Sequence, residues 1–173
     1  HSFKEEQDIR LMGGVGKKLP YTWILMMIGT LALTGFPFLS GFYSKDAIIE
    51  FAYLRGTNIG YVAAGMGILT AFLTSIYSWR LFFKTFHGKY SNKKISIDKI
   101  HESPMVMIIP LIVLAFGAAF SGYIFKDLLI SHDSYVLFWK ESITFLSPIN
   151  HEHPPIWLLL LTPTLIILSI PIS

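Results

Sequence analysis

The sequence contains no cysteine and few charged residues, 14% of its 173 residues, where soluble domains average about 25%. The absence of cysteine excludes disulfide bonds, thiolate metal sites and thiol chemistry. The shortage of charge, with 53% hydrophobic residues and a mean hydropathy of +0.54, is typical of a protein surrounded mostly by lipid. A formal net charge of only +3, scattered among apolar runs, argues against binding to nucleic acid.

The two ends of the sequence predict a piece of a longer protein. The chain opens at His1 with a charged segment that lacks the apolar core of a signal peptide. It stops at Ser173 directly after an apolar run, without a polar tail.

Four apolar blocks follow one another along the chain and predict an all-α polytopic membrane protein with about four transmembrane segments. The last three blocks are each near the roughly 20 residues that a helix needs to cross the hydrocarbon core. The expected organisation is a cytoplasmic loop over 1–19, an interrupted transmembrane helix over 20–55, a transmembrane helix over 56–86, a basic cytoplasmic loop over 87–104, a transmembrane helix over 105–127, an external loop over 128–154 and a transmembrane helix over 155–173.

The first block is too long for one regular span and too short for two. As a single helix it would measure about 50 Å, well above the membrane thickness. Its middle contains Gly35, Pro37 and Gly41. Proline removes a backbone donor and disfavours helix in the residue before it, and glycine loosens the chain further. Two half-helices separated by a break are therefore expected, an arrangement found at transporter sites.

The distribution of basic residues supports a single crossing by the first block. Lysine and arginine are frequent before Pro20 and in the 87–104 loop, whereas Arg55 alone lies between the first and second blocks. The positive-inside rule then places both basic segments in the cytoplasm. The two segments share one side only if the first block crosses the membrane once.

Lys45 and Asp46 follow the break, inside an apolar stretch, and are the principal candidates for a proton relay. An ionisable residue near the bilayer centre costs about 2.5–3.5 kcal/mol on insertion scales and usually faces a pathway or a partner. Lysine suits such a relay because burial makes it release its proton more readily. Glu50 lies off the helical face of Lys45. The alternative is that Ser44, Lys45 and Asp46 only cap a helix at the membrane surface.

Hydroxyl side chains in the second block share one helical face, because Thr70, Thr74 and Ser78 recur at every fourth residue. Such hydroxyls hold a water chain or bind helix to helix, and packing is the favoured reading. His87 at the membrane edge suits proton exchange with water, although an exposed loop histidine fits equally well. The possible accessory polar path comprises Thr70, Thr74, Tyr77, Ser78, Arg80 and His87.

Two histidine-containing motifs do not predict a metal site. His101 begins a zinc-protease-like pattern, but Met105 stands where the second histidine would be. Residues 151–153, His-Glu-His, read better as a polar turn before two prolines. No hydrolytic triad and no cofactor motif is visible, so neither a metal nor a cofactor is expected in this segment.

Several segments resemble one known family. EQDIRLMGG (6–14) with KKLP (17–20) is similar to the loop that leads into the interrupted helix of the subunit L family (subunit 5 in mitochondria) of NADH:quinone oxidoreductase, respiratory complex I. IGTLALTGFP (28–37) and SGFYSKD (40–46) are similar to that helix and its break. SIYSWRL (75–81) and TFHG (85–88) resemble the next helix and its exit. The likeness is continuous to about residue 88, roughly half of the chain.

The resemblance implies a non-redox, proton-translocating membrane subunit of a respiratory enzyme. Lys45 matches the lysine of the family's second interrupted helix, and Asp46 matches its acidic neighbour. NADH, FMN, iron–sulfur clusters and quinone are expected in partner subunits. The implied partners are other membrane subunits, especially the adjacent antiporter-like subunit, together with the lipid bilayer and protons. The expected location is a bacterial inner membrane, with the mitochondrial inner membrane as the alternative.

Two other functions remain open at this point. The first is the large subunit of a multisubunit sodium/proton antiporter, a relative of the same family. The second is a structural membrane scaffold, in which Lys45 and Asp46 form only an interface ion pair.

Overall fold

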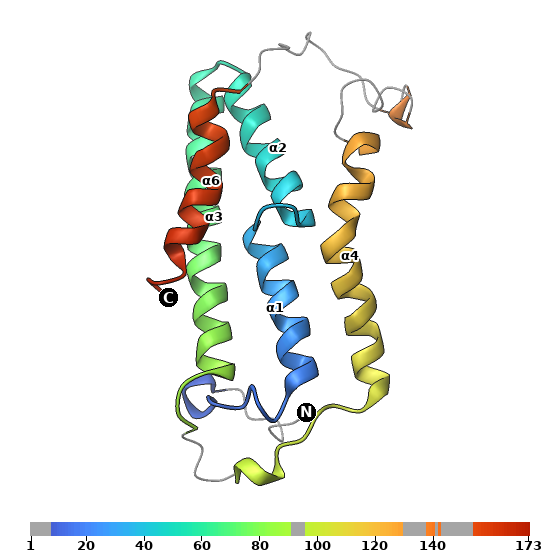
Figure 1. The fold of residues 1–173 in the computed structure, drawn as a ribbon. Helices are drawn as coiled ribbons and strands as arrows, with labels where there is room; N and C mark the ends of the chain where they lie inside the picture. Colours follow the sequence, from blue (N-terminus) through green and yellow to red (C-terminus); the bar gives the residue numbers. More distant parts are fainter. Residues whose placement is uncertain (1–7, 91–95, 130–137, 141, 143–153) are drawn as a thin grey trace.

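The computed structural model describes residues 8–90, 96–129, 138–140, 142 and 154–173, and its helices form a bundle (Figure 1). The longer helices are α1 (Pro20–Thr34), α2 (Ser40–Leu54), α3 (Asn58–Phe86), α4 (Met105–Leu129) and α6 (Ile156–Ser169). Two short 3-10 turns, η1 (Ile9–Leu11) and η2 (Ile97–Lys99), lie in the connecting segments. The predicted all-α class is confirmed, and the described residues contain no strand.

The first apolar block is an interrupted helix, as predicted. α1 and α2 have 15 residues each, about 22 Å, so neither half crosses a membrane by itself. Figure 1 shows them following one another along one path through the bundle. The break covers Gly35 to Leu39, and Ser40 and Gly41 already belong to the first turn of α2. The expected break over 35–41 is therefore two residues too long at its end.

Two helices are long and apolar enough to cross a membrane among the residues described: α3, with 29 residues, and α4, with 25. The start of α1, the end of α3 and the start of α4 lie at one end of the bundle in Figure 1. The end of α2 and the starts of α3 and α6 lie at the other end. The amino-terminal segment and the loop after α3 therefore share one side, as the charge pattern requires.

α6 is shorter than the span expected over 155–173, because its 14 residues measure only about 21 Å. The Ser169 hydroxyl donates to the Ile166 carbonyl at 2.6 Å, which competes with regular backbone bonding. Pro171 has no N–H with which to continue the helix. The chain consequently turns after Ser169.

Two apolar clusters hold the bundle. The larger one, near the amino-terminal end of α1, consists of Val15, Leu19, Trp79, Phe82, Phe86 and Ile100. The smaller one joins α2, α3 and α6 through Ile49, Ala64 and Leu158. α4 is largely exposed along its length, as expected of a helix that faces lipid or further protein. The external loop predicted over 128–154 lies mostly outside the described residues.

Candidate functional site at the helix break

The break is built by a helix-terminating motif followed by a tight turn. Gly35 adopts a left-handed conformation (φ 87°, ψ 36°). Its N–H donates to the Ala32 carbonyl at 3.2 Å, and the Phe36 N–H donates to the Leu31 carbonyl at 3.0 Å. These two bonds are the Schellman motif, which favours glycine at this position. They leave the Leu33 carbonyl at the end of α1 free for another donor.

The turn after Gly35 contains Pro37 and then Phe38 with a positive φ of 72°. The Leu39 N–H closes it by donating to the Phe36 carbonyl at 3.2 Å. Proline followed by a residue with positive φ is the pattern of a type II turn, in which the second position favours glycine. Phe38 therefore carries backbone strain, and its ring is 79% exposed.

The two halves and α4 approach one another closely at the break. A Cβ atom added at Gly41 would overlap the Ala32 carbonyl oxygen of α1. A Cβ added at Gly122 of α4 would lie 2.5 Å from the Ser40 Cα and 2.8 Å from the Tyr43 ring. Glycine is therefore required at both positions for the backbones to pack as they do.

Lys45 points back across the break. Its Nζ donates a hydrogen bond to the Leu33 carbonyl in the last turn of α1. A cation at the carboxyl end of a helix is stabilised by the exposed carbonyls and the helix dipole. Gly35 leaves room for the lysine stem, since a Cβ there would lie 3.3 Å from the Lys45 Cδ. The ammonium thus bridges the second half-helix to the first.

Asp46 points elsewhere and is 8% exposed. Its carboxyl lies beside the Thr162 hydroxyl of α6, and its Oδ2 atom has no hydrogen-bond partner. Glu50 lies one turn further along the same face of α2 and close enough to act on Asp46 electrostatically. The described residues contain no ion pair between Lys45 and Asp46. The two neighbouring side chains of α2 therefore have different partners: Lys45 bonds to α1, and Asp46 lies against α6.

Other buried hydroxyls lie between α1, α3 and α6, and the sequence reading missed most of them. Ser75 and Ser169 are fully buried, and their hydroxyl oxygens lie 2.5 Å apart. Thr34 is also fully buried and donates to the Leu31 carbonyl at 3.1 Å. Ser78, which the accessory path included, is 3% exposed, and its Oγ has no hydrogen-bond partner.

The remaining members of the accessory path do not gather with Ser78. The outer face of α3 exposes Thr70, Tyr77 and Arg80, whereas Thr74 is half-buried. The Thr70 hydroxyl donates to the Met66 carbonyl of its own helix at 2.7 Å. The helical spacing was read correctly, but the sequence alone does not reveal which face of α3 meets α1.

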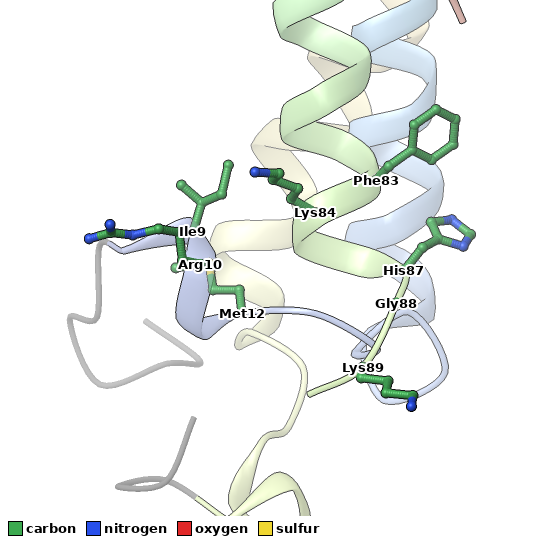
Figure 2. Close-up of a pocket in the computed structure, with 8 residues that line it drawn as sticks. All are labelled: Ile9, Arg10, Met12, Phe83, Lys84, His87, Gly88 and Lys89. Carbon is green, nitrogen blue, oxygen red and sulfur yellow. The ribbon is translucent and has the colours of Figure 1, made fainter. Parts of the chain in front are cut away.

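His87 lies at the end of α3, far along the bundle from the break. Its Nε2 accepts a hydrogen bond from the Trp23 indole at 3.2 Å. Indole only donates, so this bond requires the neutral histidine with an unprotonated Nε2. His87 also lines a hollow of about 600 Å³, with basic residues around it (Arg10, Lys84 and Lys89). Figure 2 shows these basic side chains diverging rather than meeting at one point.

The other histidine motifs have structural surroundings or lie outside the described residues. The His101 Nδ1 contacts the Glu102 carbonyl oxygen at 3.0 Å, while the Glu102 carboxylate binds the first turn of α1. Residues 151–153 belong to the part of the chain that is not described. In the described part of the chain, no three histidine or carboxylate side chains come together as metal ligands would.

The amino-terminal segment is tied to the end of α3 by its glycines. The Gly14 N–H donates to the His87 carbonyl at 3.0 Å, and the Gly16 N–H donates to the Phe86 carbonyl at 3.1 Å. Nearer the amino terminus, the Arg10 guanidinium and the Arg10 N–H both donate to the Asp8 carboxylate, which lowers the pKa of that carboxyl to about 2.

Comparison with known proteins agrees with the resemblance predicted from the sequence. Residues 1–74 match the family described as "NADH:quinone oxidoreductase/Mrp antiporter, TM". Over 87% of its own length, the present chain is 46% identical to "NADH-ubiquinone oxidoreductase chain 5" of Marchantia polymorpha. It is 45% identical to the protein of that name from Phytophthora infestans over 88% of its length, and 43% identical to that from Arabidopsis thaliana over 84%. In each case it spans 22% of the relative's length.

Proposed function

We propose that this chain, a membrane segment of the NADH:quinone oxidoreductase/Mrp antiporter family, carries part of a proton route in a chain 5 type subunit of respiratory complex I. The chain covers about a fifth of its curated relatives, so the activity belongs to the whole subunit and its complex. In this role the segment moves protons and performs no redox step. NADH, FMN, iron–sulfur clusters and quinone are assigned to partner subunits.

One observation carries the proposal: an ionisable ammonium stands at a break in a membrane helix. Lys45 Nζ donates to Leu33, whose carbonyl the helix-terminating motif leaves unused. A charged side chain inside a membrane is costly and usually marks an ion or proton pathway. The backbone freed by the break supplies a polar partner for the lysine without a fixed counter-charge.

The protonated lysine would release its proton when nearby charge or hydration changes. Asp46 lies beside Thr162 of α6, and Glu50 is close enough to act on it electrostatically. The two carboxylates lie one helical turn apart on the same face of α2. They would form a second station, and Lys45 would exchange with it through water rather than through a direct ion pair.

The test is Lys45→Met in the full-length protein within the assembled complex, in sealed vesicles, with NADH oxidation and proton uptake followed together. Lys99→Met is a matched control because Lys99 is exposed in η2, far from the break. The proposal expects reduced proton uptake per NADH in Lys45→Met only. Full uptake with an intact complex would remove Lys45 from the proton route.

Two alternatives make different predictions. A sodium/proton antiporter, a member of the same matched family, would show transport that depends on sodium. A structural scaffold held by a Lys45–Asp46 ion pair is disfavoured, because Lys45 bonds to Leu33 and the described residues hold no such pair. The scaffold alternative predicts that Lys45→Met impairs assembly but leaves the pumping of assembled complexes unchanged.

The location and the partners are also proposals. The matched relatives named above come from eukaryotes and are named for ubiquinone. They favour the mitochondrial inner membrane, the alternative of the sequence analysis, over a bacterial membrane. The exposed faces of α3 and α4 would then pack against the rest of the subunit, adjacent antiporter-like subunits and lipid.

A further inference from the structure

The first turn of α1 receives its cap from a residue far along the chain. Leu19 precedes α1 and offers no side-chain hydrogen bond, and Pro20 has no N–H. The Trp23 N–H is satisfied by the Leu19 carbonyl at 2.9 Å. This leaves the N–H groups of Tyr21 and Thr22, which a helix cannot satisfy internally.

Glu102 supplies the missing acceptors from the segment that leads into α4. Its Oε1 accepts from the Tyr21 N–H at 2.7 Å and from the Thr22 N–H at 3.3 Å. Its Oε2 accepts from the Thr22 hydroxyl at 2.7 Å. Both carboxylate oxygens are therefore engaged, and the negative charge sits at the positive end of the helix dipole.

The segment that carries Glu102 is itself fixed to the bundle. Ile100 is 3% exposed and packs with Val15 and Leu19 in the larger apolar cluster. Asp98 pairs with Lys18 at 3.3 Å, just before α1. The residues just before Glu102 therefore hold its segment close to the start of α1.

The opposite end of α1 meets Lys45. One 15-residue half-helix thus has a carboxylate at its amino end and an ammonium on its Leu33 carbonyl at the other. The buried residues of α1, Thr30, Ala32 and Thr34, all lie in its second half. Its first half has partly buried contacts, the Trp23–His87 bond and the Glu102 cap to hold it.

We propose that Glu102 is a positioning residue for the proton route: by capping α1 it fixes the axial position of the half-helix and so keeps the Leu33 carbonyl on Lys45. This inference rests on the proposed function of Lys45. A slide of α1 by about 1.5 Å, the rise of one residue, takes Leu33 out of hydrogen-bond range of the ammonium. Glu102 itself handles no transported proton.

The test uses the full-length protein in the assembled complex, with three variants. Glu102→Ala removes the cap, Glu102→Gln keeps one acceptor oxygen without the charge, and Lys99→Ala, at an exposed residue, is a control in the same segment. Hydrogen exchange of the Tyr21 and Thr22 amides reports the cap. Proton uptake per NADH in sealed vesicles reports the route.

We expect Glu102→Ala to speed exchange at Tyr21 and Thr22 by roughly 2- to 30-fold, the range expected for loss of a helix cap. Its proton uptake per NADH should fall, and Glu102→Gln should recover part of both losses. Lys99→Ala should match the unchanged protein. Unchanged exchange in Glu102→Ala, or faster exchange with full proton uptake, would overturn the positioning role.

Thr22→Val provides a second variant if Glu102→Ala complexes do not assemble. It removes only the donor to Oε2 and keeps the side-chain size. Faster exchange with reduced uptake would support the role, and faster exchange with full uptake would overturn it. Lys45→Met separates the two proposals: full uptake in that variant defeats the proposed function, whereas reduced uptake there with full uptake in Glu102→Ala defeats only the positioning role.

Discussion

Gly122 offers a sharp test of how α4 packs against the helix break. An added Cβ would lie 2.5 Å from the Ser40 Cα, 3.2 Å from its nitrogen and 2.8 Å from the Tyr43 ring. Non-bonded carbon atoms prefer separations of about 3.5–4.0 Å, so α4 and α2 would have to part by about 1 Å. Ser40 contributes backbone atoms, which yield less than a flexible side chain. Inserted volume of this kind costs about 1–3 kcal/mol.

Gly117 is a matched control five residues earlier on the same helix. A Cβ there meets nothing within 4 Å. Because alanine is the better helix former, Gly117→Ala should stabilise by up to about 1 kcal/mol. Each substitution adds one methyl group to α4, and their effects on stability should have opposite signs and differ by about 1–4 kcal/mol.

The assay is the fraction of intact complex after graded heating, measured on native gels for each full-length variant. Gly122→Ala should dissociate at a lower temperature than the unchanged protein, and Gly117→Ala at the same or a higher one. Lys126, one turn after Gly122, lies over the Tyr43 ring at 5.5 Å and should lose that contact in the same variant. Equal tolerance of both substitutions would refute close packing of α4 at the break.

Three further predictions concern the strained turn, the histidine contact and the amino-terminal turn. Phe38→Gly should stabilise the turn by about 1–2 kcal/mol by relieving the positive φ, and a lower dissociation temperature would contradict this. Trp23→Phe and His87→Phe should each cost about 0.5–1.5 kcal/mol and be non-additive in the double variant; full additivity would exclude a direct bond. Because the pKa of Asp8 is lowered to about 2, the contribution of its bonds with Arg10 is complete above pH 3.8 and is lost as the pH falls through 2. Arg10 amide exchange, corrected for its intrinsic pH dependence, should stay slow at pH 4, and opening there would contradict the assignment.

The interrupted helix was predictable because its cause is local. Pro37 and the length of the apolar block exclude a single straight span. The first boundary follows from Gly35, whose left-handed conformation ends α1. The second boundary was placed too late, because Gly41 is needed for close approach to α1 rather than for a further break.

The surroundings of the site depend on contacts between distant parts of the chain. Glu102 caps a helix that begins 82 positions earlier, and Thr162 meets Asp46 from α6. No local pattern indicates either contact. The outward direction of Tyr77 likewise follows from which face of α3 packs on α1. One local signal was available but unused: Asp46 and Glu50 are four residues apart and share a face.

The number of protons taken up per NADH oxidised by Lys45→Met complexes shows whether Lys45 lies on a proton route. Lys45→Arg keeps a cation that does not release its proton, and Lys99→Met controls for loss of a lysine elsewhere. We expect reduced uptake in both Lys45 variants at normal complex content, with the Lys99 variant unaffected. Full uptake in Lys45→Met would exclude Lys45 from the proton route and leave the lysine as a structural bridge between the two half-helices.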